Sequence, residues 1–236
     1  MKYLLAGVLA VASMTTIAAE TDAPTPFRAE YATFRNGEEL GRTTLTLVAN
    51  ADRTFTLRSE TEGTMGLAKI AGVHVVETSH FHWKNGRPEA IDYDYKQDSA
   101  LKNRTRHATF DAKSGQVDVT EGNDTFRYAI VPGLIDRHAV TLAIAMDLKH
   151  GAKSFDYKVA VKDHVEDMTY ERAGNEKVDV PAGSFDAVVI RRSGDSSGDR
   201  ARIARSWFSS KIGWLPVQIE QQDKKDTVTL KLAKAP

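Results

Sequence analysis

The 236-residue sequence lacks cysteine and has no excess of charge of either sign. The absence of cysteine excludes disulfides and a lipid-modified cysteine. The 32 lysines and arginines are matched by 32 aspartates and glutamates, and the two signs alternate along the chain. Since proteins that bind nucleic acid carry a basic patch or stripe, we do not expect nucleic acid as a partner.

Long apolar runs are also scarce, and the one at the N-terminus has the pattern of a secretory signal peptide. Met1–Lys2 supplies a positive charge, Tyr3–Ala12 is uncharged, and Ser13–Ala19 is small and mildly polar. The run is about half the ~20 apolar residues that a membrane-spanning helix needs. We therefore expect an exported, periplasmic protein, cleaved after residue 18 or 19 and without a transmembrane segment. A retained N-terminal anchor is the alternative.

The rest of the chain alternates apolar and polar residues between turn signals. Phe27, Ala29 and Tyr31 share one face of a predicted strand, and Asn36–Gly37 separates it from the next; Asn85–Gly86 repeats the device. Two strands joined by Asn-Gly are a strong hairpin signal. About a dozen such strands predict a mainly β fold, an antiparallel sheet curled into a barrel, half-barrel or sandwich. We expect a signal peptide over residues 1–19, a short leader over 20–25 and a single β-rich domain over 26–236.

One segment in the middle of the chain, Val131–Gly151, has helical spacing. Asp136 is a candidate N-cap, and Gly151 ends the run. The apolar face, which includes Leu142 and Met146, is too wide to stay uncovered. We expect one central helix to cover the concave side of the curled sheet. It is either a plug that completes the core or a lid over a ligand cavity, in which case Leu142 and Met146 would contact the ligand.

A second apolar stretch, Thr64–Val76, is punctuated by glycines. Its side chains Met65, Leu67 and Ile70 fit a core-facing strand or short helix, since most apolar runs belong to the core. The alternative is a mobile flap at the mouth of a cavity, where the same three residues would bind a ligand.

Arginines at strand positions suggest a site for an anionic head group. The candidates are Arg104, Arg106, Arg191 and Arg205. The alternative is that they are solvated outer-face residues, because arginine is rarely buried without a partner.

Tests for enzyme motifs give little support to catalysis. His74, His80 and His82 share one strand face, and His80 and His82 lie about 7 Å apart at that spacing. A third ligand such as His107 would be needed for zinc, and neither an HExxH pattern nor an adjacent carboxylate accompanies them. His80 and His82 are therefore only weak metal candidates, and no Gly-x-Ser-x-Gly elbow indicates a hydrolase. We predict no catalytic residue and no cofactor.

Three blocks together resemble a known family. They are "VPGLIDRHAVTLAIAMDLKHG" at Val131–Gly151, "VDVPAGSFDAVVIRR" at Val178–Arg192 and "RSWFSSKIGWLPVQIEQ" at Arg205–Gln221. With the two Asn-Gly hairpins they make the chain, from about Pro26 to Leu232, similar to the exported bacterial family of domain of unknown function 3108. The resemblance implies an envelope protein of antiparallel β-structure and brings no catalytic residues. Its shape is similar to that of periplasmic lipoprotein carriers and related lipid-binding half-barrels.

The expected function is therefore that of a non-enzymatic periplasmic protein in envelope biogenesis. It would bind or carry a lipid-like or other amphiphilic ligand, with the tail under the helix and the head group near the strand arginines. The first alternative is a structural or assembly module that acts through contacts with an envelope protein. A metal-dependent or other hydrolase comes third.

Overall fold

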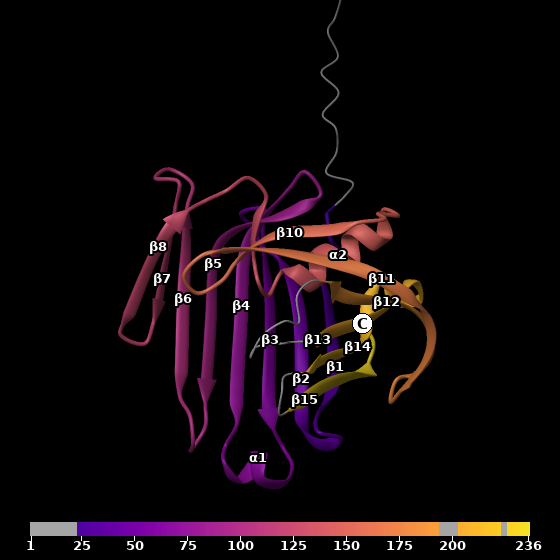
Figure 1. Cartoon of the computed structure of the whole chain (residues 1–236). Coiled ribbons are helices and arrows are strands. Elements are labelled where there is room, and N and C mark those ends of the chain that lie inside the picture. Colours follow the sequence, from indigo (N-terminus) through magenta and orange to yellow (C-terminus); the bar gives the residue numbers. More distant parts are fainter. Residues whose placement is uncertain (1–22, 194–202, 223–225) are drawn as a thin grey trace, which may run out of the picture.

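In the computed structural model, which describes residues 23–193, 203–222 and 226–236, fifteen strands form one sheet (Figure 1). The predicted signal peptide lies outside the described residues. The strands are β1 (Phe27–Arg35), β2 (Glu38–Ala49), β3 (Thr54–Gly63), β4 (His74–Lys84), β5 (Arg87–Asp98), β6 (Arg104–Asp111), β7 (Gln116–Glu121), β8 (Asp124–Ala129), β9 (Leu134–Asp136), β10 (Phe155–Ala160), β11 (Val165–Val180), β12 (Gly183–Ser193), β13 (Ile203–Ser209), β14 (Leu215–Gln222) and β15 (Thr227–Lys234).

Within the described ranges, two α-helices interrupt the strands, α1 (Gly66–Ile70) and α2 (Val140–Lys149), and one 3-10 turn, Ser210–Ile212, precedes β14. Among the described residues, no helix has the length and apolar character needed to cross a membrane.

The sheet runs from β8 through β1 and β15 to β9, so that β1 pairs with β15 and joins the two halves. Neighbouring strands of the sheet pair antiparallel, except that β9 is parallel to β10. Figure 1 shows β1–β6 standing upright while β10–β15 cross beside them, with α2 in between. The prediction of a mainly β fold, built on one curled antiparallel sheet, is confirmed.

Both predicted Asn-Gly hairpins are present. Asn36 and Asn85 each have φ of 52°, and Gly37 and Gly86 follow with φ of 84° and 75°. Positive φ at both central residues is what a tight two-residue hairpin requires, because such a turn matches the twist of the flanking strands.

Helix α2 packs into the concave side of the sheet with apolar contacts on two sides. Leu142 and Met146 join a cluster with Phe81 of β4 and its neighbours on β2 and β3. Ile144 and Leu148 join another cluster, built on β10, β12 and β13. The helix therefore fills the space between the two halves of the sheet, which is the arrangement expected of a plug.

Candidate binding site on the inner face of the sheet

Alternation along neighbouring strands places a polar cluster on the inner face of the sheet. The inner face carries the buried residues, such as Phe81 on β4 and Val119 on β7. Every second residue of a strand points to the same face, so the residues two and four positions away from these share the inner face with them. Nearer the end of each strand, those residues are polar. With contributions from β11 and from the segment before α2, they form what we call the inner polar cluster: Glu77, Tyr93, Tyr95, Arg104, Arg106, Glu121, Arg137 and Tyr170.

One part of the cluster is a carboxylate shared by two guanidinium groups. Arg104 donates to Oε1 of Glu121 over 3.0 and 2.7 Å, and Nε of Arg106 donates to Oε2 over 2.7 Å. The Arg106 side chain is only 9% exposed. Burial alone would raise the pKa of Glu121, but the hydrogen bonds from Arg106 and Arg104 outweigh it and hold that pKa below its usual range. Two cations on one anion leave this part with excess positive charge.

A third guanidinium, Arg137, approaches from the segment between β9 and α2. Its Nε lies 3.8 Å from Oε1 of Glu77, and its side chain is 41% exposed. Tyr93 donates a 2.6 Å hydrogen bond to the same Glu77 oxygen. Among the described residues, Arg137 therefore has one long ion pair, and its side chain is about as exposed as that of Arg104 and far more exposed than that of Arg106.

Buried contacts on either side of Arg137 fix its position. The Ser79 hydroxyl donates to Oδ1 of Asp136 over 2.7 Å, so its oxygen accepts from Nδ1 of His138 at 3.0 Å. Oδ1 of Asp136 also accepts from the backbone N–H groups of His138 and Ala139. The predicted N-cap Asp136 thus closes the turn before α2, whereas Ala139 occupies the N-cap position itself.

The Ser79, Asp136 and His138 side chains do not form a hydrolase triad. Ser79 is fully buried, and its hydroxyl proton is directed at Asp136, away from the imidazole. Oδ2 of Asp136 and Nε2 of His138 are buried and find no hydrogen-bond partner among the described residues. Burial raises the pKa of Asp136. The three residues anchor the start of α2 to β4.

Tyrosines complete the cluster as neutral hydroxyl groups. Burial and the nearby Glu77 carboxylate raise the pKa of Tyr95, although Arg104 and Arg137 act in the opposite direction. Burial also raises the pKa of Tyr170, which likewise feels the charge of Arg137. Within the part of the chain that the structure describes, the Tyr170 hydroxyl donates to the Met168 sulfur at 3.6 Å, and sulfur is a weak acceptor. Tyr170 can therefore donate to a stronger acceptor.

The sequence model of the family described as "Protein of unknown function (DUF3108)" matches residues 26–233. The chain belongs to the DUF3108 family. A search of curated proteins gives no match. Among solved structures, the DUF3108 chain is similar to a β-barrel-like protein of domain of unknown function DUF1849 from Brucella abortus, with a TM-score of 0.56 and 12% identity over 89% of this chain and 96% of that one. That likeness is one of fold.

A second similar structure is a lipoprotein candidate from Parabacteroides distasonis. Its TM-score is 0.35 at 11% identity, over 90% of this chain and 96% of that one.

The other two predicted arginines of this DUF3108 protein lie away from the inner polar cluster. Arg191 of β12 is directly opposite Arg205 of β13. Their side chains are 57% and 43% exposed, and they pair with Glu171 at 2.5 Å and Glu220 at 3.8 Å. The structure therefore brings Arg104 and Arg106 together and leaves Arg191 and Arg205 as solvated residues of another part of the sheet.

The expectation that Met65, Leu67 and Ile70 face the core was wrong, although the short helix is present. All three side chains are exposed, Met65 just before α1 and the other two within it, and Ala68 is the buried residue of the helix. The reason is the location of α1 at the tip of the β3–β4 hairpin, beyond the reach of the core. It also lies apart from α2, so Leu142 and Met146 do not adjoin these residues.

His74 and His80 of the predicted face, and His107 of β6, have partners that are not adjacent to them in the sequence. His80 contacts Thr54 Oγ1 at 2.8 Å and Asp92 at 3.3 Å, His74 contacts Glu60 at 2.8 Å, and His107 contacts Asp94 at 2.8 Å. The carboxylates come from neighbouring strands, which explains why none appears beside the histidines in the sequence. In the described part of the chain, the group with metal-ligand proximity is Glu60, Glu62 and His74, which includes neither His80 nor His82.

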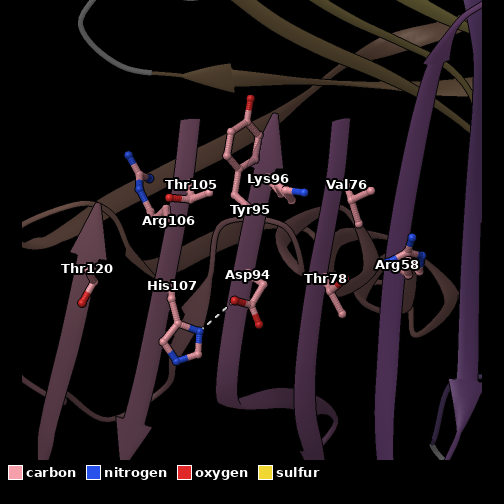
Figure 2. A pocket seen from close by; sticks show the side chains of 10 residues that line it. All are labelled: Arg58, Val76, Thr78, Asp94, Tyr95, Lys96, Thr105, Arg106, His107 and Thr120. Carbon is pink, nitrogen blue, oxygen red and sulfur yellow. Dashed lines mark hydrogen bonds and ion pairs between the residues drawn. The ribbon is translucent and has the colours of Figure 1, made fainter. Parts of the chain in front are cut away.

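The outer face of the same strands carries a pocket of about 470 Å³, shown in Figure 2. Arg58, Thr78, Asp94, His107 and Thr120 lie directly opposite one another across β3–β7 and form its floor. The pocket is large enough for a small ligand, but ligand pockets are lined predominantly by apolar side chains. An acyl chain would also have to desolvate the charged groups on the floor, such as Arg58 and Asp94, which makes this pocket a poor place for one.

Proposed function

We propose that this DUF3108 protein is a non-enzymatic protein of the bacterial envelope that binds an anionic amphiphile. The observation that carries the proposal is the convergence of Arg104, Arg106 and Arg137 on the inner face, from two segments far apart in the sequence. Location in the envelope is inferred from the N-terminal sequence pattern, and it remains part of the proposal.

Charge supports an anionic head group. The three arginines of the inner polar cluster face two carboxylates, Glu77 and Glu121, so an anion would meet a net positive site. Guanidinium groups bind phosphate and carboxylate through paired hydrogen bonds. Arg137 is held by one contact of 3.8 Å and can turn toward a ligand. The Tyr170 hydroxyl, whose pKa burial raises, would donate a further hydrogen bond.

Half-buried apolar side chains beside the cluster support a place for the tail. Phe126, Tyr128, Val131 and Val165 pack against the core of β5–β7 without being buried by it. They form a seam where the edge strand β8 and the residues after it meet the segment from Val161 to the start of β11. There Tyr128 donates to the carbonyl of Val161 at 2.8 Å. We propose this seam for the tail in preference to the space under α2, because Leu142 and Met146 are packed tightly there.

The same tight packing favours the alternative of a structural or assembly module. Because side chains of the protein itself fill the interior around α2, the core needs no ligand to fill it. The two functions differ in whether the inner polar cluster binds an amphiphile, so the same experiment separates them.

Calorimetric titration with three twelve-carbon probes tests the proposal. We expect dodecyl phosphate to bind more tightly than dodecyl phosphocholine and dodecyl maltoside. Arg137→Gln should weaken the binding of dodecyl phosphate about tenfold, the loss typical of a charge-assisted contact. Arg205→Gln is the matched control, on β13 and away from the inner polar cluster, and should bind like the wild type. Failure of the wild type to bind dodecyl phosphate, or equal affinity for all three probes, would overturn the proposal.

A further inference from the structure

Four exposed apolar side chains gather at one end of the molecule. Leu67 and Ile70 of α1 are each 82% exposed, Met65 before the helix is 47% exposed, and Leu101 of the β5–β6 loop is 89% exposed. In Figure 1, α1 is the lowest point of the molecule as drawn. The backbone N–H of Ala100 donates to the carbonyl of Ala71 over 2.8 Å, which joins the two loops. We call Met65, Leu67, Ile70 and Leu101 the apolar tip.

The tip is a fixed platform and not a frayed loop. The N–H groups of Thr64 and Met65 both donate to the carbonyl of Leu40, over 2.9 and 3.1 Å, and Val73 donates to the carbonyl of Ala68. A Cβ at Gly63 would come within 2.7 Å of the Ala68 carbonyl oxygen, so only glycine allows α1 this close to β3. With Ala68 against the strand, Leu67 and Ile70 are held on the outward side.

Exposed apolar side chains of this size cost free energy in water, so a cluster of them commonly marks an interaction surface. The shape and charge of this one fit a lipid bilayer. Its side chains project from a convex end, as in proteins that insert apolar residues at the boundary of head groups and acyl chains. Lys69 lies within α1 and Lys102 next to Leu101, and among the described residues neither makes an ion pair. Lysines beside inserted apolar residues are attracted to anionic lipid head groups.

Acidic residues lie behind the tip, on the strands. Asp98 at the end of β5 is paired with Lys96 at 2.9 Å, and Glu62 near the end of β3 faces His74 on β4. Glu38 and Glu39 of β2 also lie toward this end, because the neighbouring Leu40 accepts from Thr64 and Met65. Lys69 and Lys102 are the charged residues that lie within the tip or directly beside it in the sequence.

We propose that the apolar tip docks the protein on the surface of an anionic phospholipid bilayer. The inference deepens the proposed function and rests on it, because a protein that carries an amphiphile must exchange it with a membrane. Docking through the tip leaves the inner polar cluster on the same upright strands, a short distance behind the membrane surface.

Flotation with lipid vesicles tests the inference. We expect the wild type to float with vesicles of phosphatidylglycerol and phosphatidylethanolamine and far less with phosphatidylcholine alone. The double variant Leu67→Gln/Ile70→Gln should lower the vesicle affinity about tenfold or more, since two apolar anchors are lost. Val48→Gln is the matched control, because Val48 is 46% exposed but lies at the opposite end of β2.

Two further variants guard against a folding artefact. Leu101→Gln is on a different loop and should also weaken binding, and Lys102→Gln should weaken it about fivefold and reduce the preference for anionic lipid. Each variant should keep the circular dichroism spectrum of the wild type and its affinity for dodecyl phosphate in solution.

The outcomes separate the two proposals. A wild type that binds dodecyl phosphate but floats with neither vesicle overturns the docking inference alone, as does equal flotation of the tip variants and Val48→Gln. A wild type that floats through its tip but binds no amphiphile overturns the proposed function alone.

Discussion

Replacing Leu142 by alanine should destabilise the protein strongly, because α2 is packed from two sides. Leu142 is 5% exposed and joins Leu47, Phe55, Phe81 and Trp83 in one apolar cluster. The substitution removes about three methylene equivalents, each worth about 0.8 kcal/mol of burial. A cavity cost adds to this, because hydrogen-bonded strands cannot collapse into the gap. We expect a loss of about 3–4 kcal/mol in the free energy of unfolding.

Denaturant and thermal unfolding provide the assay. A loss of that size should lower Tm by about 6–16 °C in a domain of this length. Val48→Ala, on an exposed site, is the control and should change the stability by less than about 0.5 kcal/mol. Leu142→Asp should fail to fold, since it would bury an unpaired carboxylate. A loss below about 1 kcal/mol for Leu142→Ala, or a folded Leu142→Asp protein, would show that there is room beneath α2 and refute the plug.

Three further predictions concern charged and titratable groups. Glu121→Gln should lower the stability by about 3 kcal/mol at neutral pH, because it leaves the buried Arg106 without its carboxylate, and should raise the affinity for dodecyl phosphate in titrations; unchanged affinity would count against the site. Burial raises the pKa of Asp136 above 3.8, so its stabilising contribution is full below that pH and is lost as the pH rises through the folded-state value. Asp136→Asn should therefore gain stability relative to wild type as the pH rises above about 4, the ordinary pKa of an aspartate, in denaturant titrations at a series of pH values. A difference in stability that does not change with pH would contradict the raised pKa. The double variant His80→Ala/His82→Ala should fold, and elemental analysis should find no stoichiometric zinc in the wild type; zinc that the variant loses would support a metal site.

Local sequence patterns were enough to predict most of the fold. Asn36–Gly37 and Asn85–Gly86 encode their hairpins through backbone preferences that act within a few residues, and alternation identified the strand faces. The pairing of strands that are far apart in the sequence could not be predicted. The pairing of β1 with β15 depends on contacts between the two ends of the domain, for which no local signal exists.

The candidate site was predicted only in part for the same reason. Arg104 and Arg106 were found because alternation puts both on one face of a single strand. Arg137 was missed, since its position depends on the hydrogen bond from Ser79 to Asp136, which joins residues 57 positions apart. Alternation also could not tell that Arg191 lies on a different part of the sheet. The apolar residues of α1 were misplaced because an exposed apolar surface and a core strand have the same composition.

Native mass spectrometry of the protein purified from its own bacterium tests the central claim most directly. The account predicts a bound anionic amphiphile on the wild type, at one molecule per chain, that is retained by Arg205→Gln and lost or sharply reduced in Arg137→Gln. A wild type that carries no such adduct, or an adduct that survives unchanged in Arg137→Gln, would contradict the assignment of the inner polar cluster as a head-group site.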